Sequence, residues 1–167
     1  GIPFGIISAV ARDRWPDNVI RVFSLASISS PRFFLALLLQ ILFGIGIGIL
    51  PLGSRFPTLV APPPTVTGLL TVDAILAHNW DALGMTLRHM ILPAFALSLS
   101  PLATITRMMR ASVLEVMQQD FVLTERALGL PRRLILFKYV LKNAFISTLT
   151  VIGLYFGWLL SGSVLVE

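Results

Sequence analysis

Residue types that could perform catalysis or bind a metal are sparse in this 167-residue sequence. It contains two histidines, His78 and His89, and no cysteine, whereas a zinc site needs three or four ligands at suitable spacing. Ser163 follows Gly162 in an apolar run, but the sequence positions no base or acidic residue to activate it as a nucleophile. The phosphate-binding pattern G-x-x-x-x-G-K-[ST] is absent. The sequence therefore predicts no catalytic centre, no metal site and no cofactor.

The composition indicates the class of protein. Hydrophobic residues make up 56% of the chain and charged residues 13%, against about 25% charged in a typical soluble domain. The mean hydropathy is +0.87. A net charge of +5 could suggest a nucleic-acid partner, but the basic residues sort into the segments between apolar runs instead of gathering on one folded surface. We therefore predict a membrane protein that contacts lipid and binds no nucleic acid.

Three apolar runs are candidates for membrane spans. Residues 33–50, 90–106 and 145–166 carry no charge, and a hydrocarbon core requires about 20 helical residues. Residues 1–10 are also apolar but too short, so we expect them to be the end of a truncated span. A lone apolar strand would leave its backbone groups unsatisfied in lipid. The expected fold is thus an all-α membrane protein, a transmembrane helix bundle forming a single domain over residues 1–167.

Small residues within two of these spans have the spacing of close helix contacts. Gly44 and Gly48 form one G-x-x-x-G pair, and Gly153 and Gly157 form another. Such pairs let helices approach closely in lipid. Glycine is also simply common in membrane helices, so the spacing alone leaves both interpretations open. The hydroxyl residues of the spans are equally ambiguous, because they could line a solute path or satisfy their own helix backbone.

Basic residues predict the orientation of the chain. With the residues at the span ends included, the first loop carries four, the Pro-rich segment 51–84 with its flank carries two, and residues 107–143 carry seven. The first and third loops share one side of an alternating topology. The positive-inside rule therefore predicts a cytoplasmic segment 107–143 and a periplasmic segment 51–84, in which residues 69–76 could form a short helix.

The segment from Arg107 to Asn143 has the pattern of an amphipathic helical hairpin. Apolar residues recur at helical spacing through its first half, Gly129 is a natural helix stop, and Pro131 suits the start of a second helix. Such a hairpin could dock on a cytoplasmic protein. It could equally be a basic amphipathic loop lying on anionic headgroups, and periodicity does not separate the two.

The amino-acid sequence of this segment resembles that of a known family. The chain reads RASVLEVMQQDFVLTERALGL and then LKNAF, which is similar to the EAA loop of the inner-membrane permeases of dipeptide, oligopeptide and nickel ABC importers. The opening GIPFG and the stretch LRHMILPA also resemble that family. Two positions depart from the family pattern, Glu125 where it usually has Ala and Leu128 where it usually has Lys. The resemblance, with the basic residues of the turn, suggests that ATPase coupling involves Asp120, Glu125, Arg126, Ala127, Gly129, Leu130, Arg132, Arg133 and Asn143.

The resemblance implies a transporter subunit and not an enzyme. We would expect a multi-pass protein of a bacterial or archaeal inner membrane, importing peptides or a related small solute by alternating access. Its expected partners are ABC ATPase subunits that hydrolyse the ATP, a second permease subunit and a periplasmic or lipid-anchored solute-binding protein. Family permeases have about six spans, so three spans and a stub would be part of one. The alternative is a channel or scaffold protein that works without an ATPase.

Overall fold

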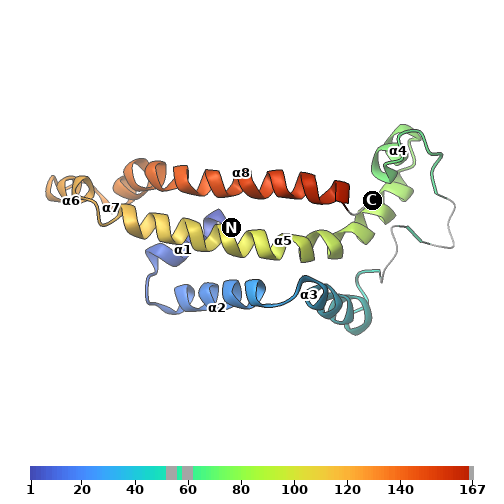
Figure 1. Ribbon diagram of the computed structural model, residues 1–167, viewed down its shortest axis with the longest axis horizontal. Helices are drawn as coiled ribbons and strands as arrows, with labels where there is room; N and C mark the ends of the chain where they lie inside the picture. Colours follow the sequence, from blue (N-terminus) through green and yellow to red (C-terminus); the bar gives the residue numbers. More distant parts are fainter. Residues whose placement is uncertain (52–55, 58–61, 166–167) are drawn as a thin grey trace. The chain divides into compact units, whose positions relative to one another are not determined.

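The computed structural model describes the backbone of residues 1–51, 56–57 and 62–165, and the side chains of these residues except 32 and 159–165. Every regular element in the described residues is helical (Figure 1). Two of the elements, η1 and η2, are π-helical. In chain order the elements are α1 (Ile2–Val10), α2 (Trp15–Ser29), α3 (Arg32–Leu39), η1 (Gln40–Gly46), α4 (Leu70–Leu76), α5 (Trp80–Val116), α6 (Asp120–Ala127), α7 (Arg132–Leu134), η2 (Ile135–Val140) and α8 (Leu141–Leu165).

The chain divides into two compact units. The first comprises Gly1–Ser29 and Ser100–Glu167, and the second comprises Ser30–Leu99. Helix α5 contributes its C-terminal part to the first unit and its N-terminal part to the second.

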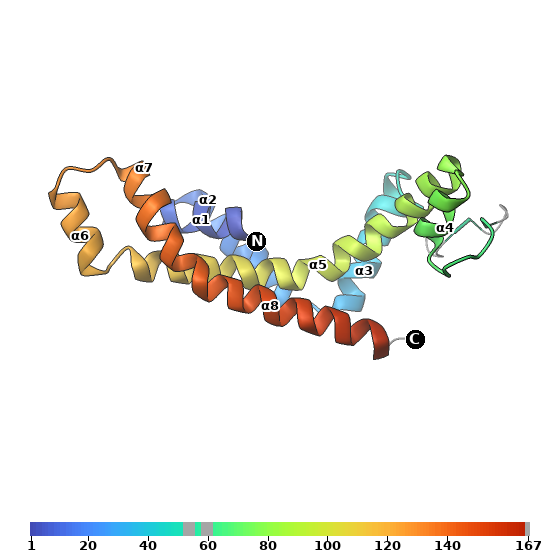
Figure 2. The same ribbon diagram turned by 90° about the horizontal axis from the view of Figure 1, so that it is seen from above.

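In the first unit, α8 runs along the C-terminal part of α5, as both Figure 1 and Figure 2 show. Tyr155 donates a hydrogen bond of 3.0 Å to Thr104 Oγ1, and the Thr148 hydroxyl lies 3.2 Å from Met109 Sδ. Apolar side chains are also buried between these helices, which stabilises the unit. The core of the unit consists of Ala9, Met109, Val113, Val116, Val122, Ile135, Val140 and Ala144.

Helix α1 lies very close to α5 because Gly5 within it and Gly1 at its N-cap have no side chain. A Cβ atom at Gly5 would lie 2.6 Å from Met109 Cβ and 2.7 Å from the Thr106 carbonyl oxygen. At Gly1 it would lie 2.7 Å from Ile105 Cβ. Gly1 and Gly5 are therefore a G-x-x-x-G contact. By contrast, a Cβ at Gly153 or Gly157 would meet no described atom within 4 Å, so close packing at that pair remains a prediction.

Two segments are long and apolar enough to cross a membrane, Trp80–Val116 and Arg132–Trp158. A third exists if α2 and Phe33–Gly46 form one broken span. The expected span 90–106 lies inside α5, which continues for ten residues beyond Thr106. The helix extends beyond the apolar run because helical hydrogen bonding does not require lipid. Residues such as Arg107 and Arg110 have a high helix propensity and favour its continuation outside the membrane. Pro93 and Pro101 do not interrupt α5.

Hydroxyl side chains on these helices bond mainly to their own backbone. Thr86 donates to the Ala82 carbonyl at 2.8 Å, Thr106 to that of Leu102 at 2.7 Å, and Thr150 to that of Ile146 at 3.3 Å. These bonds to the carbonyl four residues earlier are the local alternative foreseen for Ser and Thr in helices. They leave little need to assign these hydroxyls to a solute path.

The second unit contains α3, η1, α4 and the N-terminal part of α5. Leu39 of α3 packs with Leu92, Ala96 and Leu99 of α5. The run expected as one span at residues 33–50 is helical only to Gly46, and Gly48 has a left-handed φ of +69°. Gly44 and Gly48 therefore do not share one continuous helix.

The short helix expected near residues 69–76 is α4, and one carboxylate secures its start. Asp73 Oδ1 accepts bonds of 2.7 Å from the backbone N–H and from the hydroxyl of Thr67, and Oδ2 accepts one of 3.2 Å from the Gly68 N–H. Asp73 is buried. These donors, the Thr67 backbone N–H foremost, lower the pKa of the Asp73 carboxyl below its ordinary value.

Candidate functional site

The segment 107–143 forms a helical hairpin, but its first half is not one helix. Helix α5 ends at Val116, and α6 begins at Asp120. Between them Gln118 donates to the Glu115 carbonyl at 3.1 Å, and Gln119 has an extended backbone with ψ 149°. The prediction of one continuous amphipathic helix here is therefore wrong, because a turn interrupts it. The apolar spacing that suggested a single helix continues across the break. Figure 1 and Figure 2 show α6 standing beyond the end of α5, with α7 returning the chain to α8.

Gly129 ends α6 as predicted. Its φ is +78°, a left-handed conformation that a residue with a Cβ adopts only with strain. The Gly129 N–H donates to the Arg126 carbonyl at 3.0 Å, and the Leu130 N–H donates to the Glu125 carbonyl at 3.3 Å. This pair of bonds is a Schellman motif, which satisfies the last carbonyl groups of the helix. Pro131 then forms the N-cap of α7.

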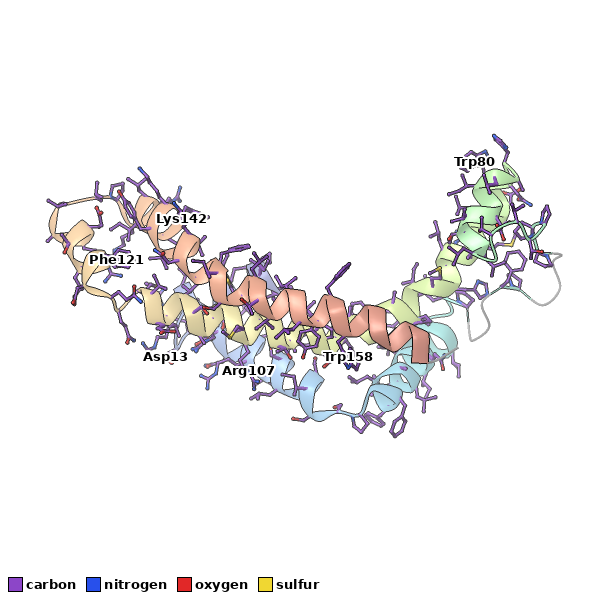
Figure 3. The ribbon with its side chains drawn as sticks, turned by 45° about the horizontal axis from the view of Figure 1, so that its top comes forward. Asp13, Trp80, Arg107, Phe121, Lys142 and Trp158 are labelled. Carbon is purple, nitrogen blue, oxygen red and sulfur yellow. The ribbon has the colours of Figure 1, made fainter. Side chains whose placement is uncertain are left out.

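The inner face of the hairpin is anchored in the core of the first unit. Val122 of α6 is fully buried, and Ile135 of η2 is 3% exposed. Phe121 and Leu130 are half-buried and pack against the same core. Figure 3 labels Phe121 on α6. The hairpin is therefore held on the helix bundle by apolar contacts.

The outer face carries most of the residues predicted to contact an ATPase. Leu128, next to the glycine turn, is 72% exposed. Glu125 and Leu130 are half-buried, which makes them supports of the turn more than parts of its surface. Asn143 lies on α8 and donates to the Tyr139 carbonyl at 2.9 Å. The remaining predicted residues are exposed: Asp120, Arg126, Ala127, Gly129, Arg132 and Arg133.

Two of these arginines line one cleft. Arg126 from α6 and Arg132 from α7 border a cavity of about 350 Å³, whose apolar wall includes Val10, Met117 and Ile135. The cleft combines cationic groups at its rim with apolar side chains, which suits an acidic or amphipathic surface of a partner protein.

A buried polar cluster lies next to this hairpin, and sequence reasoning missed it. The Asp17 carboxylate is fully buried and accepts bonds from Arg110 Nε at 2.8 Å and Arg110 Nη2 at 2.7 Å. It also accepts bonds from the Ser8 hydroxyl and from the Asp13 N–H at 3.0 Å. The cluster joins α1, α2 and α5. Its only sequence signal is that Asp17 is an acid among arginines, because the 93 residues between Asp17 and Arg110 hide their pairing.

The histidines do not form a metal site in the part of the chain that the structure describes. No group of three or more His, Cys, Asp or Glu residues is placed there to hold an ion. The His89 ring is bonded to the Met85 carbonyl at 2.8 Å. Ser163, considered above as a nucleophile, lies outside the described side chains.

Comparison with known proteins gives a consistent result. A family model described as "Binding-protein-dependent transport system inner membrane component" matches residues 1–167. The whole chain is 42% identical to the probable D,D-dipeptide transport system permease protein DdpB of Escherichia coli (strain K12), covering 49% of it. It is 40% identical to the di/tripeptide transport system permease protein DppB of Pseudomonas aeruginosa (strain UCBPP-PA14), covering 49%. It is 39% identical to the dipeptide transport system permease protein DppB of Alkalihalophilus pseudofirmus (strain ATCC BAA-2126 / JCM 17055 / OF4), covering 50%.

The chain thus spans about half the length of the curated relatives it matches. The match confirms the family that the segments GIPFG, LRHMILPA and RASVLEVMQQDFVLTERALGL suggested.

Proposed function

This chain belongs to the family of binding-protein-dependent transport system inner membrane components, and from that premise we propose that it is part of a permease subunit of an ATP-driven importer. The transported solute is a peptide or a related small molecule, a proposal supported by the dipeptide and di/tripeptide systems named for its relatives. ATP hydrolysis is assigned to a separate subunit, since the sequence has no phosphate-binding loop.

The observation that carries this proposal is the construction of the hairpin. Its inner face is anchored by Val122 and Ile135, while its tip presents the exposed Leu128 beside basic residues. A loop that lies on headgroups needs no rigid turn, whereas a surface fitted to a protein partner does. The Schellman motif at Gly129 supplies that rigidity.

We assign the hairpin to contact with the ATPase. Closure of the ATPase subunits around ATP would displace α6, and the apolar contacts of α6 with the core would pass the movement to α5 and α8 as a rigid-body motion. Residues at the tip then contact the partner, whereas Glu125 and Leu130 hold the turn. The second permease subunit and the solute-binding protein complete the assembly.

Crosslinking in the assembled transporter tests this assignment. In the full-length protein, Leu128→Cys should crosslink to the ATPase subunit and not to the solute-binding protein, because Leu128 is the most exposed apolar residue of the hairpin. Val66→Cys is the matched control, since Val66 is 71% exposed but lies in the segment predicted to be periplasmic. It should give no ATPase crosslink.

The same experiment distinguishes the importer from the alternative, a channel or scaffold with a headgroup-bound loop. In that case Leu128→Cys would react with a bilayer-embedded reagent and would give no ATPase adduct while solute movement remained intact. Such a result would contradict the importer proposal.

A further inference from the structure

A second cleft of the first unit lies between α2 and α5, and no residue of α6 or α7 lines it. Its volume is about 270 Å³. From α2 it is lined by Arg21, Ser24, Leu25 and Ile28, and Arg107 of α5 lines the facing wall. Figure 3 labels Arg107 on α5, where this helix passes α2.

Two cations in this cleft have no counter-charge in the described part of the chain. The ion pairs there are Arg12 with Asp13 and Arg110 with Asp17, so neither Arg21 nor Arg107 takes part in one. Arg110 also borders the cleft, but its charge is already engaged by Asp17. Two guanidinium groups with free donors are suited to bind a phosphate, because each presents a planar fork of N–H groups.

A buried hydroxyl in the same cleft lacks a hydrogen-bond partner. Ser24 is 6% exposed, and its Oγ has no partner among the described residues. Ser27, three residues later on the same helix, instead donates to the Phe23 carbonyl at 2.9 Å. An unpaired buried hydroxyl costs free energy unless a ligand or water satisfies it. Ser24 therefore indicates a polar ligand group within the cleft.

The rest of the cleft wall is apolar and open to the surroundings. Leu25 is 54% exposed and Ile28 is 38% exposed. They follow Arg21 by four and seven residues, so the cation and the two apolar side chains lie on one face of α2. A soluble anion would use only the polar end of this face. A ligand with a phosphate and an acyl chain would use all of it.

We propose that this cleft binds an anionic phospholipid. Arg21 and Arg107 bind the phosphate, the Ser24 hydroxyl donates to a headgroup oxygen, and an acyl chain lies along Leu25 and Ile28. Basic pockets between membrane helices bind acidic headgroups on the same physical grounds. The site involves neither α6 nor the turn at Gly129, and it does not depend on the importer proposal.

Lipid retention by the full-length, purified protein tests the proposal. Delipidated protein is incubated with phosphatidylglycerol or phosphatidylcholine, and bound lipid is measured by native mass spectrometry. Wild type should retain phosphatidylglycerol in preference to phosphatidylcholine. The double variant Arg21→Gln/Arg107→Gln should retain about thirtyfold less phosphatidylglycerol, from the usual contribution of two cations near a headgroup.

The matched control removes two cations outside the cleft. Arg12→Gln/Arg14→Gln makes the same change of charge on the exposed turn between α1 and α2, and it should retain phosphatidylglycerol like wild type. An equal loss in both double variants would indicate a general effect of surface charge and would overturn the specific site. Equal retention in all three proteins would overturn it as well.

Ser24→Ala provides a test that does not depend on removing charge. It should weaken phosphatidylglycerol retention several-fold without lowering the unfolding temperature of delipidated protein, because no partner is left unpaired. Unchanged retention would contradict the role of the hydroxyl.

Competition identifies the source of the phosphate. Inorganic phosphate or glycerol phosphate at millimolar concentration should not displace the lipid, and displacement would show a soluble-anion site instead.

Discussion

Arg110 of α5 donates two hydrogen bonds, of 2.8 and 2.7 Å, to the fully buried carboxylate of Asp17 at the start of α2. Loss of the partner has different consequences for the two charged groups. The Arg110 side chain is 21% exposed and can reach solvent if Asp17 is lost, whereas Asp17 has no exposed surface. If Arg110 is lost, the Ser8 hydroxyl and the Asp13 N–H are the remaining donors to Asp17 among the described residues.

We therefore predict that Arg110→Met destabilises the protein more than Asp17→Ala does. Removing one partner of a buried pair costs about 3–5 kcal/mol when the other charge stays buried. The double variant should be more stable than the sum of the single effects suggests, because it leaves neither charge unpaired. Unfolding temperatures of the four full-length proteins in detergent give this comparison. Additive effects would show that the pair contributes no coupling.

The close contact of Gly5 with α5 gives a second prediction. In Gly5→Ala the new Cβ would lie 2.7 Å from the Thr106 carbonyl oxygen, and a backbone atom cannot move as readily as the end of a flexible side chain. Overpacking of this kind costs about 1–3 kcal/mol. Gly84→Ala in the same helix as Thr106 is the control, since its Cβ would meet no described atom within 4 Å. Thermal unfolding should distinguish the two, and equal stability would show that α1 can shift freely.

The glycines also show what local sequence could and could not predict. Gly129 was predictable as a helix stop, because a left-handed residue before a new helix is a local requirement. The spacing of Gly1 and Gly5 is the same as that of Gly153 and Gly157, yet a Cβ would clash only at the first pair. Which pair makes a close contact depends on which helices lie together, and spacing carries no information about that.

The apolar runs predicted the helical class correctly, and the family segments predicted a coupling site, which stays a prediction. The breaks in the helices were not visible in the sequence. The helical spacing of Met117 and Phe121 continues across the turn that separates α5 from α6. Similarly, the uncharged run 33–50 shows no sign that the helix ends at Gly46. The partnership of Asp17 with Arg110 was equally hidden, because it joins residues far apart in sequence.

Acid sensitivity of α4 is a third prediction. The Thr67 backbone N–H and hydroxyl lower the pKa of Asp73, so the carboxylate stabilises the start of α4 above its ordinary pKa of 3.8. This stabilisation is lost as the pH falls below that value towards the lowered pKa, because the bonds require the charged form. The protection factors of the α4 amides, which correct hydrogen exchange for its intrinsic pH dependence, should therefore fall on acidification. In Asp73→Asn these protection factors should be lower at neutral pH and nearly independent of pH over the same interval.

A fourth prediction concerns orientation. Leu128 and Val66 are 72% and 71% exposed, so a cysteine at either position should be equally reactive in detergent. In intact cells an impermeant thiol reagent should label Val66→Cys and spare Leu128→Cys, because the positive-inside rule predicts that segment 107–143 lies in the cytoplasm. The native chain has no cysteine to interfere. Labelling of Leu128→Cys from outside would reverse the orientation and exclude its contact with an ATPase.

The last prediction concerns the turn itself. A Cβ at Gly129 would meet no described atom within 4 Å, so substitution there tests backbone strain and not steric overlap. Val is disfavoured at a φ of +78° by about 1–2 kcal/mol, whereas Asn tolerates this conformation better. The anchors Val122 and Ile135 lie in the core and should keep the hairpin folded in either variant.

In the full-length transporter, Gly129→Val should therefore insert and assemble but lose most of its solute-stimulated ATP hydrolysis, and Gly129→Asn should keep most of it. The measurement is hydrolysis in proteoliposomes with and without solute and binding protein, at matched amounts of assembled complex. Because the strain is small compared with the stability of a helix bundle, a selective loss in the valine variant would place the turn geometry in the coupling step. Full stimulation in Gly129→Val would instead show that the turn need not fit a partner, and would favour a hairpin that rests on lipid.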